Sequence, residues 1–337
     1  MGLYFANEID DLVVDSLAGF ERAHADSVAW DEANGFVRAL TPSPTRRVGL
    51  VSGGGSGHEP LHIGYVGAGM LDAACPGRVF ASPHNRQIFA ASLAVARENG
   101  VLHLVKNYTG DKINFGIAAE RLAREGVDCA RVLIDDDAAS DSAEVVNGRR
   151  GTGATVLVEK ILGAAADTGM GLKDLAALGV DVVGRCRSMA VASAAHTAPA
   201  TGLPAFDLPA GGLEYGVGIH GERARRTLRE RPLRDLAADM VGTLADPLGL
   251  VSGTSVIVLV NGLGGITRME LYAVLHEVTK VLDGRGAAVE RTLVGDFVTA
   301  LDMRGFSLTL LVADADTLAY YDAPAHTPAW PATAPVV

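Results

Sequence analysis

Two histidines that lie next to glycine-rich segments are the side chains of this sequence best suited to chemistry. His58 follows the run Gly-Gly-Gly-Ser-Gly at residues 53–57, and His220 stands within Gly-Val-Gly-Ile-His-Gly-Glu at residues 216–222. Glycine lets a ligand approach main-chain N–H groups closely, so such segments can cradle an oxygen-rich molecule. A neutral imidazole can act there as a base, a metal ligand or a nucleophile toward a carbonyl. Either histidine could instead be structural.

The glycine-rich run before His58 fits neither of the two common nucleotide-binding loops. A Walker loop needs Gly-Lys-Ser/Thr, but His58 stands directly after Gly57, where the lysine would be. The dinucleotide fingerprint needs Gly or Ala three positions after Gly57, and Pro60 stands there. Two interpretations remain: a small-molecule loop with His58 at its lip, and a tight strand-to-helix turn with a solvated histidine.

Residues 106–111 (Lys-Asn-Tyr-Thr-Gly-Asp) place a cation and a carboxylate on one short segment after an apolar run. The flexible amine of Lys106 can donate to hydroxyl or phosphate oxygens. The carboxylate of Asp111 can orient a hydroxyl group or remove its proton. A polar turn that closes a strand is the other interpretation of this segment.

Two further polar segments remain ambiguous. Residues 135–137 (Asp-Asp-Asp) could hold magnesium, but acidic side chains at a strand end more often cap the following turn or face solvent. Residues 148–151 (Gly-Arg-Arg-Gly) could bind phosphate at a helix N-terminus, or the arginines could pair with carboxylates in a subunit contact. We assign no metal site to this chain.

The elements that must position these residues alternate in type along the first half of the chain. Apolar runs alternate with longer helical patterns, which indicates an α/β fold with a largely parallel sheet. Ligands gather at the carboxyl ends of the strands in such sheets, where the polar segments stand here. The predicted strands cover 48–52, 78–81, 101–106 and 131–134, and the predicted helices cover 85–98, 115–124, 152–166 and 172–183.

The second half starts a new round of the same alternation. We therefore predict two α/β domains, each with a mostly parallel or mixed sheet flanked by helices. Residues 1–186 would carry the glycine-rich substrate loop, and residues 187–337 would carry His220. The predicted strands of this half cover 215–219, 255–260, 289–294 and 306–312, and the predicted helices cover 233–244 and 268–282.

Composition narrows the classes of partner. A formal net charge of −11 and a pI near 5.3 argue against nucleic acid or an anionic membrane surface as a partner. The three cysteines are widely spaced and odd in number, which is typical of reduced thiols in the cytoplasm. The sequence offers no credible targeting segment or membrane span. We expect a cytoplasmic protein that binds small molecules and other proteins.

Six ordered motifs together resemble the dihydroxyacetone kinases, and specifically their substrate-binding K part. The resemblance extends over essentially the whole chain, through Leu-Val-Asn-Gly-Leu-Gly-Gly at 259–265 to the segment at 322–330. The motifs are V-S-G-G-G-S-G-H-E-P at 51–60, G-A-G-M-L-D-A-A-C-P-G at 67–77, V-K-N-Y-T-G-D-K-I-N-F at 105–115, I-D-D-D at 134–137, G-R-R-G at 148–151 and G-V-G-I-H-G-E at 216–222.

The resemblance implies a role for each candidate residue. His220 would form a covalent hemiaminal with the keto carbon of dihydroxyacetone. His58 and Asp111 would be the acid/base pair that acts on the hydroxyl group receiving phosphate. Lys106 and the loop residues Gly55, Ser56 and Gly57 would position the substrate.

The resemblance also implies that the phosphate donor is held elsewhere. The sequence has no Walker loop and no H-R-D or D-F-G set, and it ends at Val337 without a helical nucleotide-binding L domain. We therefore expect a separate K subunit without a cofactor of its own, working with an L subunit that carries ADP or ATP with magnesium. A phosphotransferase-system M protein could supply the phosphate, and the family suggests a homodimer.

Some segments depart from the family pattern and leave the substrate open. They are His-Asn-Arg-Gln at 84–87, Ala-His-Thr-Ala-Pro at 195–199, and Arg223 after the G-I-H-G-E motif. A four-carbon ketose such as erythrulose is an alternative substrate. A non-catalytic ketose sensor that activates a transcription regulator is an alternative function, although a sensor would not need the base formed by His58 and Asp111.

Overall fold

The structure of the chain is a computed structural model that describes residues 4–141, 148–223 and 226–331. Its contacts divide the chain into two compact units. We call them the β3 unit and the β10 unit, after a central strand of each. The β3 unit comprises Phe5–Ile134, Thr155–Val182 and Asp316–Val337; the β10 unit comprises Met1–Tyr4, Asp135–Ala154 and Val183–Ala315.

The β3 unit is built on a mixed six-stranded sheet in the order β1-β2-β4-β3-β5-β6. Strands β4, β3, β5 and β6 run parallel to one another, whereas β1–β2 and β2–β4 pair antiparallel. The predicted parallel sheet of the first half is therefore confirmed, with an antiparallel hairpin added at one edge. The strands are β1 (Val28–Asp31), β2 (Phe36–Ala39), β3 (Gly49–Ser56), β4 (Ala73–Val79), β5 (Val101–Lys106) and β6 (Cys129–Ile134).

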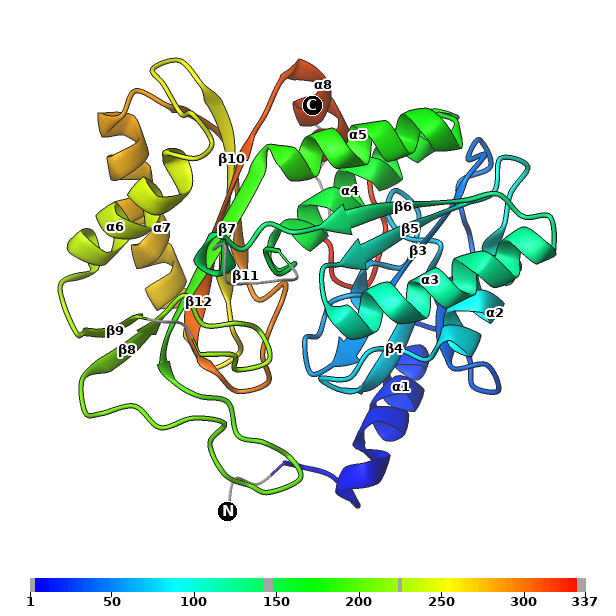
Figure 1. Cartoon of the computed structure of the whole chain (residues 1–337), viewed down its shortest axis with the longest axis horizontal. Coiled ribbons are helices and arrows are strands. Elements are labelled where there is room, and N and C mark those ends of the chain that lie inside the picture. Colours follow the sequence, from blue (N-terminus) through cyan, green and yellow to red (C-terminus); the bar gives the residue numbers. More distant parts are fainter. Residues whose placement is uncertain (1–3, 142–147, 224–225, 332–337) are drawn as a thin grey trace. The chain divides into compact units, whose positions relative to one another are not determined.

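Helices cover both faces of this sheet. Helices α2 and α3 pack against each other and against β3, β4 and β5, and α4 and α5 lie on the opposite side (Figure 1). Helix α2 begins in a capping box, in which the side chain of His84 accepts from Arg86 and that of Gln87 accepts from the His84 N–H. The helices are α1 (Leu12–Ala23), α2 (Asn85–Val95), α3 (Thr109–Arg124), α4 (Ala154–Asp167), α5 (Leu172–Gly184) and α8 (Ala315–Asp322), with 3₁₀ turns at Ile9–Asp11 and Ile63–Tyr65.

The β10 unit is built on a second mixed sheet of six strands, in the order β11-β10-β12-β7-β8-β9. Only the pair β10–β11 is parallel, and the other neighbours run antiparallel. The elements are β7 (Cys186–Ala194), β8 (Gly212–Tyr215), β9 (Arg226–Arg229), α6 (Leu233–Ala245), β10 (Ser255–Gly262), α7 (Arg268–Gly284), β11 (Ala288–Gly295) and β12 (Arg304–Val312), with a 3₁₀ turn at Ala138–Ser140.

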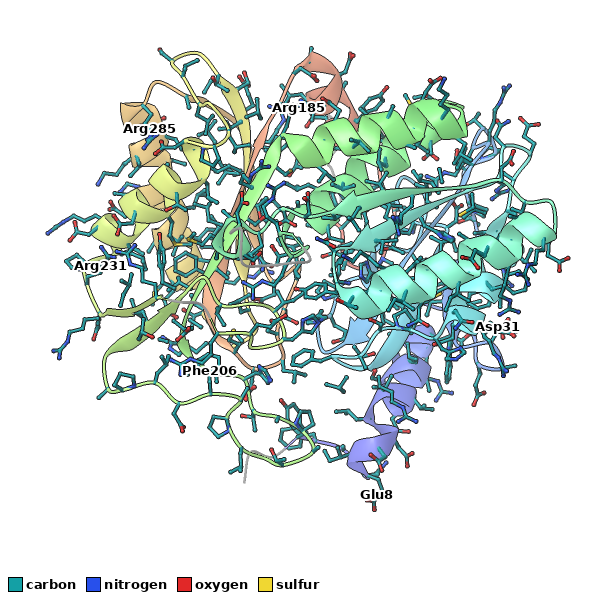
Figure 2. All side chains as sticks on the ribbon, viewed as in Figure 1. Glu8, Asp31, Arg185, Phe206, Arg231 and Arg285 are labelled. Carbon is teal, nitrogen blue, oxygen red and sulfur yellow. The ribbon has the colours of Figure 1, made fainter. Side chains whose placement is uncertain are left out.

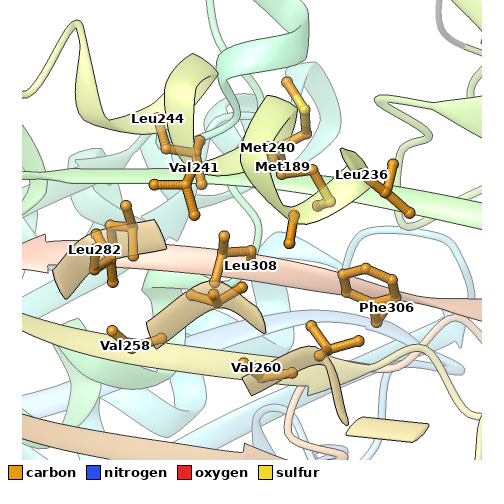
Figure 3. Packing of buried hydrophobic residues seen from close by; sticks show 14 of the residues in the cluster. Met189, Leu236, Met240, Val241, Leu244, Val258, Val260, Leu282, Phe306 and Leu308 are labelled. Carbon is orange, nitrogen blue, oxygen red and sulfur yellow. The ribbon is translucent and has the colours of Figure 1, made fainter. Parts of the chain in front are cut away.

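Apolar side chains of α6 and α7 bury one face of this second sheet. Met240 and Leu282 pack with Val258 and Leu308 in one continuous cluster (Figure 3). Full burial of such side chains contributes roughly 1.5–3 kcal/mol each. Arg231 precedes α6 and Arg285 follows α7 (Figure 2), and they form ion pairs with Asp239 and Asp246, respectively. The helical pattern predicted for 233–244 and 268–282 is confirmed.

Two predicted strands are cut short where the backbone takes an unusual angle, and a third is longer than predicted. Only the first two residues of predicted strand 78–81 belong to β4, which ends at Val79, because Phe80 has a φ of 54°. Predicted strand 215–219 shares only Tyr215 with β8, which ends there because Gly216 has a φ of 94°. In contrast, β3 continues past the predicted end at Ser52 through the glycines, as far as Ser56. The predicted glycine loop is thus mostly a strand.

The two units are not continuous segments of chain. The predicted domains, residues 1–186 and 187–337, are continuous segments of the sequence, and this division remains a prediction. In the structure the chain enters the β10 unit at Asp135, leaves it after Ala154 and enters it again at Val183. The sequence prediction also missed β7, an inner strand of the second sheet, because the division between residues 186 and 187 was placed at its first residue.

Candidate active site

The glycines of β3 are required by close approach of the protein's own atoms. A Cβ at Gly53 would lie 2.6 Å from the carbonyl oxygen of Cys75, and one at Gly55 would lie 2.7 Å from the amide nitrogen of Ala81. A Cβ at Gly54 would lie 2.2 Å from Nζ of Lys106. No residue with a side chain fits at these positions without displacing its neighbours.

The turn after β3 delivers His58 into the interior. Gly57 takes a φ of 99°, which turns the chain, and its N–H donates to both carboxylate oxygens of Glu59 at 3.1 and 2.9 Å. His58 has no exposed surface and stacks on the ring of Phe80, with the centroids 4.8 Å apart. The alternative of a solvated histidine is therefore wrong. A small cavity of about 10 Å³ lies in this part of the unit, lined by residues that include Gly54, Gly55, Ser56, Glu59 and His62.

Lys106, at the end of β5, is almost completely buried and takes part in a chain of short hydrogen bonds. Its Nζ lies 2.6 Å from Nε2 of His62, and Nδ1 of His62 lies 2.6 Å from Oε1 of Glu159. Nδ1 also lies 2.9 Å from Oγ of Ser52, which donates to the carbonyl of Leu104. The exposed fractions of Lys106, His62 and Glu159 are 1%, 4% and 0%.

In this hydrogen-bonded series, burial shifts the pKa of each ionisable side chain in the direction that favours its neutral form. It lowers the pKa of Lys106, an effect that Asp111 and Glu159 partly oppose. It raises the pKa of Glu159 to about 8, although the neighbouring Ser52 hydroxyl and the charge of Lys106 oppose the rise. Burial, together with the charges of Lys106 and His58, holds the pKa of His62 well below its usual value.

Asp111 lies in the first turn of α3, three residues after the Tyr108 N-cap. Asp111 is 3% exposed, and the charge of its carboxylate partly offsets the fall that burial causes in the pKa of Lys106. A negative charge is favoured at the N-terminal end of a helix, because it complements the helix dipole. The structure thus places His58, Lys106 and Asp111, together with Gly55, Ser56 and Gly57, in the β3 unit.

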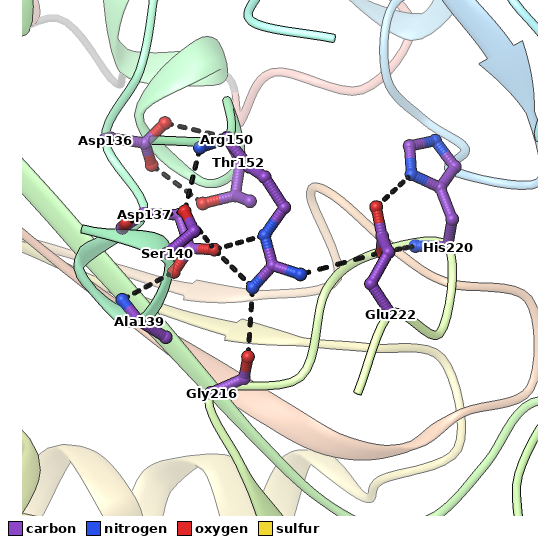
Figure 4. A network of polar contacts seen from close by, with 9 residues as sticks. All are labelled: Asp136, Asp137, Ala139, Ser140, Arg150, Thr152, Gly216, His220 and Glu222. Atoms are coloured by element: carbon purple, nitrogen blue, oxygen red, sulfur yellow. Dashed lines mark hydrogen bonds and ion pairs between the residues drawn. The ribbon is translucent and has the colours of Figure 1, made fainter. Parts of the chain in front are cut away.

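His220 lies in the β10 unit, on a turn between two glycines. Gly216 and Gly221 have φ angles of 94° and 82°, so the turn needs residues without a side chain. The carboxylate of Glu222 accepts from the backbone N–H of His220 at 2.9 Å and lies 3.0 Å from its Nδ1 (Figure 4). A carboxylate can only accept, so Nδ1 carries the proton and the lone pair of the neutral ring resides on Nε2.

Arg150 connects this histidine turn to the aspartates that follow β6. Its guanidinium donates to the carboxylate of Asp137 at 2.6 Å and to the carbonyl of Gly216 at 3.0 Å, and it lies 3.9 Å from Glu222 (Figure 4). Burial alone would raise the pKa of Glu222, but the hydrogen bond and charge of His220 and the charge of Arg150 lower it to about 2. The acceptor for His220 Nδ1–H is therefore a carboxylate at neutral pH.

The aspartates at 135–137 accept hydrogen bonds from residues that follow them in the chain. Asp136 accepts from the N–H and hydroxyl of Thr152 and from the N–H of Ala154, at 2.7 to 2.9 Å. Asp135 accepts from Arg149 at 3.0 Å. Asp137 accepts from the Ala139 N–H at the start of the 3₁₀ turn Ala138–Ser140, which confirms the capping interpretation for this residue, and both arginines pair with carboxylates of their own unit. Within residues 4–141, 148–223 and 226–331, no three His, Cys, Asp or Glu side chains are grouped to hold a metal ion.

Comparison with known proteins identifies the family. Residues 18–329 match the Dak1 domain. The chain is 41% identical to the dihydroxyacetone-binding subunit DhaK of the PEP-dependent dihydroxyacetone kinase of Escherichia coli, over 96% of this chain and 97% of that subunit. The chain belongs to the dihydroxyacetone kinase family. The resemblance found in the motifs is thereby confirmed.

Two solved structures of this family have the same fold. The dihydroxyacetone kinase of C. freundii superposes with a TM-score of 0.89 at 33% identity, over 98% of this chain and 61% of that one. The dihydroxyacetone kinase operon co-activator Dha-DhaQ also gives a TM-score of 0.89, at 32% identity over 96% of this chain and 99% of that one. The predicted fold class, α/β with mostly parallel or mixed sheets flanked by helices, is confirmed.

Sequence reasoning missed His62 and Glu159, although both carried a signal. His62 stands four residues after His58, a His-x-x-x-His spacing that was available in the sequence. Glu159 interrupts an otherwise apolar helical run at 154–164, where a carboxylate needs a buried partner. In the structure that partner is His62, and both ring nitrogens of His62 face protein groups. The spacing therefore marks a hydrogen-bond chain.

Proposed function

We propose that this chain is the dihydroxyacetone-binding subunit of a dihydroxyacetone kinase. It holds the ketose covalently on His220 while a partner transfers a phosphoryl group to the terminal hydroxyl of the ketose. The observation that carries the proposal is the His220 turn, in which Glu222 fixes the ring so that Nε2 bears the lone pair. The enzyme class is a phosphotransferase with an alcohol acceptor, in agreement with the E. coli relative.

The holding step uses the chemistry of a neutral imidazole. Nε2 of His220 attacks the keto carbon, the N–C bond forms, and the π electrons of the carbonyl move to its oxygen, which then takes up a proton. Positive charge develops on the ring as this bond forms. The carboxylate of Glu222 stabilises that charge through Nδ1–H and can accept the proton. A polyol such as glycerol has no carbonyl and cannot be held in this way.

The transfer step uses residues of the β3 unit. We assign His58 and Asp111 as the acid/base pair that removes the proton of the attacking hydroxyl, and Lys106 with Gly55, Ser56 and Gly57 as groups that position the substrate. Phosphoryl transfer depends chiefly on positioning and on neutralising charge. A tethered three-carbon substrate loses most of its freedom before the transfer, so the covalent bond lowers the entropic part of the barrier.

The phosphate donor belongs to the partner in this proposal. We infer a nucleotide-binding L subunit that carries ADP or ATP with magnesium, and a cytoplasmic location in keeping with the free thiols of Cys75, Cys129 and Cys186. The name of the E. coli relative supports phosphoenolpyruvate as the ultimate phosphate source. A homodimer and a phosphotransferase-system M protein are further parts of the proposal. Within the described residues, no helix is long and apolar enough to cross a membrane.

A second candidate function has structural support. The co-activator Dha-DhaQ matches this chain over nearly its full length with a TM-score of 0.89. A chain of that kind would bind the ketose on His220 without phosphorylating it. The presence of both His58 and Asp111, together with the higher identity to the E. coli kinase subunit, favours the enzyme.

The test is a reconstituted assay with labelled substrate. The chain is incubated with dihydroxyacetone carrying ¹³C at its keto carbon, and the adduct is followed by the loss of the ketone signal and by the mass of the intact protein. A cognate L subunit and a phosphate donor are then added, and phosphorylation of dihydroxyacetone and of erythrulose is measured in parallel. Turnover without any partner would contradict the split arrangement, and an adduct without turnover under every partner would favour the sensor.

Three variants separate the assigned roles. His220→Ala should abolish the adduct and the turnover. Asp111→Asn should leave the adduct and remove most of the turnover. His276→Ala is the matched control, because this histidine is exposed on α7 of the same unit as His220. It should change neither readout.

A further inference from the structure

The chain of hydrogen bonds beneath β3 contains two ionisable groups to which the proposed mechanism gives no role. His62 and Glu159 are as deeply buried as Lys106, and the two hydrogen bonds that link the three side chains are both 2.6 Å long. Buried ionisable groups destabilise a fold unless they are paired, and apolar side chains of similar size are often no less stable. A purely structural role is therefore a poor explanation for three such groups in series.

The donors and acceptors of Lys106, His62 and Glu159 allow two protonation states that have the same total charge. In the first state the Lys106 ammonium donates to Nε2 of His62, and Nδ1–H of His62 donates to the Glu159 carboxylate. In the second state Lys106 is an amine, Nε2–H of His62 donates to it, and Glu159 is a carboxylic acid that donates to Nδ1. The two states differ by the shift of one proton along each hydrogen bond.

The surroundings of Glu159 and of Lys106 bring the two protonation states close in free energy. Oε2 of Glu159 is fully buried and has no hydrogen-bond partner among the described residues, which disfavours the carboxylate. The charge of Asp111 on α3 favours the ammonium at the other end. Burial also moves the pKa of the acid up and that of the amine down, so the two values approach each other.

We propose that Glu159, His62 and Lys106 form a buried proton relay in which His62 passes protons between the carboxyl group and the amine. Glu159 and His62 are thus positioning residues that set the charge and the place of the Lys106 amine below Gly54. When Lys106 gives a proton to Nε2, His62 gives its Nδ1 proton to Glu159, so no proton comes from solvent. The consequence for turnover rests on the proposed function, whereas the relay does not.

Three other ionisable groups face the relay and must be considered with it. Asp111 acts on Lys106, and His58, from the turn after β3, acts on His62. Tyr65, from the 3₁₀ turn Ile63–Tyr65, is fully buried and is acted on by Glu159, which together with burial raises its pKa well above the usual value. Tyr65 therefore remains protonated over the working range. Asp111 and His58 are left unchanged in the experiment.

The test measures the relay directly in the free chain. The sequence contains only five lysines and nine histidines, so spectra of protein labelled in each residue type are simple. The Lys106 signal is identified by its loss in Lys106→Met, and the His62 signals by their loss in His62→Gln. The Lys106 side chain is titrated by its ¹³Cε shift, and the ¹⁵N shifts of the His62 ring report which nitrogen carries the proton.

Glu159→Gln keeps the shape of the side chain and removes the proton acceptor. The relay predicts that the midpoint of the Lys106 titration falls by about one pH unit or more, because a carboxylate close to the ammonium is lost. It also predicts averaged His62 shifts in the wild type that change to those of a single tautomer in Glu159→Gln. An unchanged Lys106 midpoint, or the same single tautomer in both proteins, would overturn the relay.

His103→Gln is the matched control. His103 is as buried as His62, and its Nε2 lies 2.9 Å from the hydroxyl of Ser92. Burial lowers its pKa to about 3. Its replacement should leave the Lys106 titration unmoved.

Turnover with the partner subunit completes the experiment. The high-pH limb of the rate profile should shift in Glu159→Gln by the same amount as the Lys106 midpoint, which a loss of packing alone would not produce. Spectral changes in a chain that phosphorylates no ketose would leave the relay standing and refute the proposed function. Normal turnover in Glu159→Gln with an unchanged midpoint of the Lys106 titration would refute the relay and leave the proposed function standing.

Discussion

Gly54→Ala should separate the placement of Lys106 from the stability of the fold. Gly54 lies within β3, where the backbone is extended and alanine is tolerated. The added Cβ would lie 2.2 Å from Nζ of Lys106 and 3.1 Å from Nε2 of His62. Both atoms belong to side chains, so the side chains move and the strand remains.

The size of the effect follows from these distances. Ordinary contact begins at 3.4 Å, so the amine must move by the difference from 2.2 Å, about 1.2 Å. A misplacement of about 1 Å in an active site can reduce the rate about 100-fold. Weakening the buried bond between Lys106 and His62 should reduce stability by about 1–3 kcal/mol.

Two neighbouring glycines supply the comparison. Gly55→Ala would bring its Cβ to 2.7 Å from backbone atoms of Phe80 and Ala81, which cannot rotate away. Its loss of stability should therefore exceed that of Gly54→Ala. Gly19→Ala adds a methyl group to open space on α1 and should stabilise the chain by about 0.5–1 kcal/mol without any kinetic effect.

The assay combines urea unfolding with kcat/KM for dihydroxyacetone in the presence of the partner subunit. The expected result is that Gly54→Ala loses about two orders of magnitude in kcat/KM while most of its stability remains. The kinetics of Lys106→Met should then resemble those of Gly54→Ala. If Gly54→Ala turns over at the wild-type rate, the position of Lys106 does not matter and its assignment to the site is wrong.

Three further predictions concern charge. Arg46→Met breaks buried ion pairs of Arg46 with Asp72 and Asp167, at 2.8 and 2.6 Å, and should lower the free energy of unfolding by about 3–5 kcal/mol in urea titrations. Glu222→Gln removes the negative charge beside His220 Nδ1 and should reduce the equilibrium fraction of ¹³C adduct at least about tenfold at neutral pH. Burial raises the pKa of Glu159 in the folded state from its usual 4.5 to about 8. Its contribution to stability is therefore complete below pH 4.5 and is lost as the pH rises through 8, so Glu159→Gln should flatten the fall of stability between pH 5 and 8.5.

Sequence patterns were sufficient for most of the regular elements and for the family. The strand at 101–106 is observed with the predicted bounds, and α6 differs from its predicted range by one residue. These segments have a clear apolar period and polar residues at their ends, so local preference and tertiary burial agree. The same agreement placed Lys106 at the end of a buried strand.

The sequence predicted the wrong element at the glycines and missed their partners for one physical reason. Glycine is permissive, so a run of glycines is compatible with a loop or with a strand whose neighbours come unusually close. Only the fold shows that Cys75, Ala81 and Lys106 occupy the space beside β3. The partner of His62 on α4 is likewise invisible locally, since Glu159 is 97 residues away in the chain.

The motif Gly-Gly-Gly-Ser-Gly-His therefore has a different physical basis from that of a phosphate-binding loop. In such a loop the missing side chains make room for the ligand. At Gly53 and Gly55 they make room for backbone atoms of the protein, and at Gly54 they make room for the amine of Lys106. A side chain added in β3 therefore displaces atoms of the protein interior even when no substrate is bound. This can be tested in Gly54→Ala: the titration of Lys106 should change in the free chain, before any ketose is added.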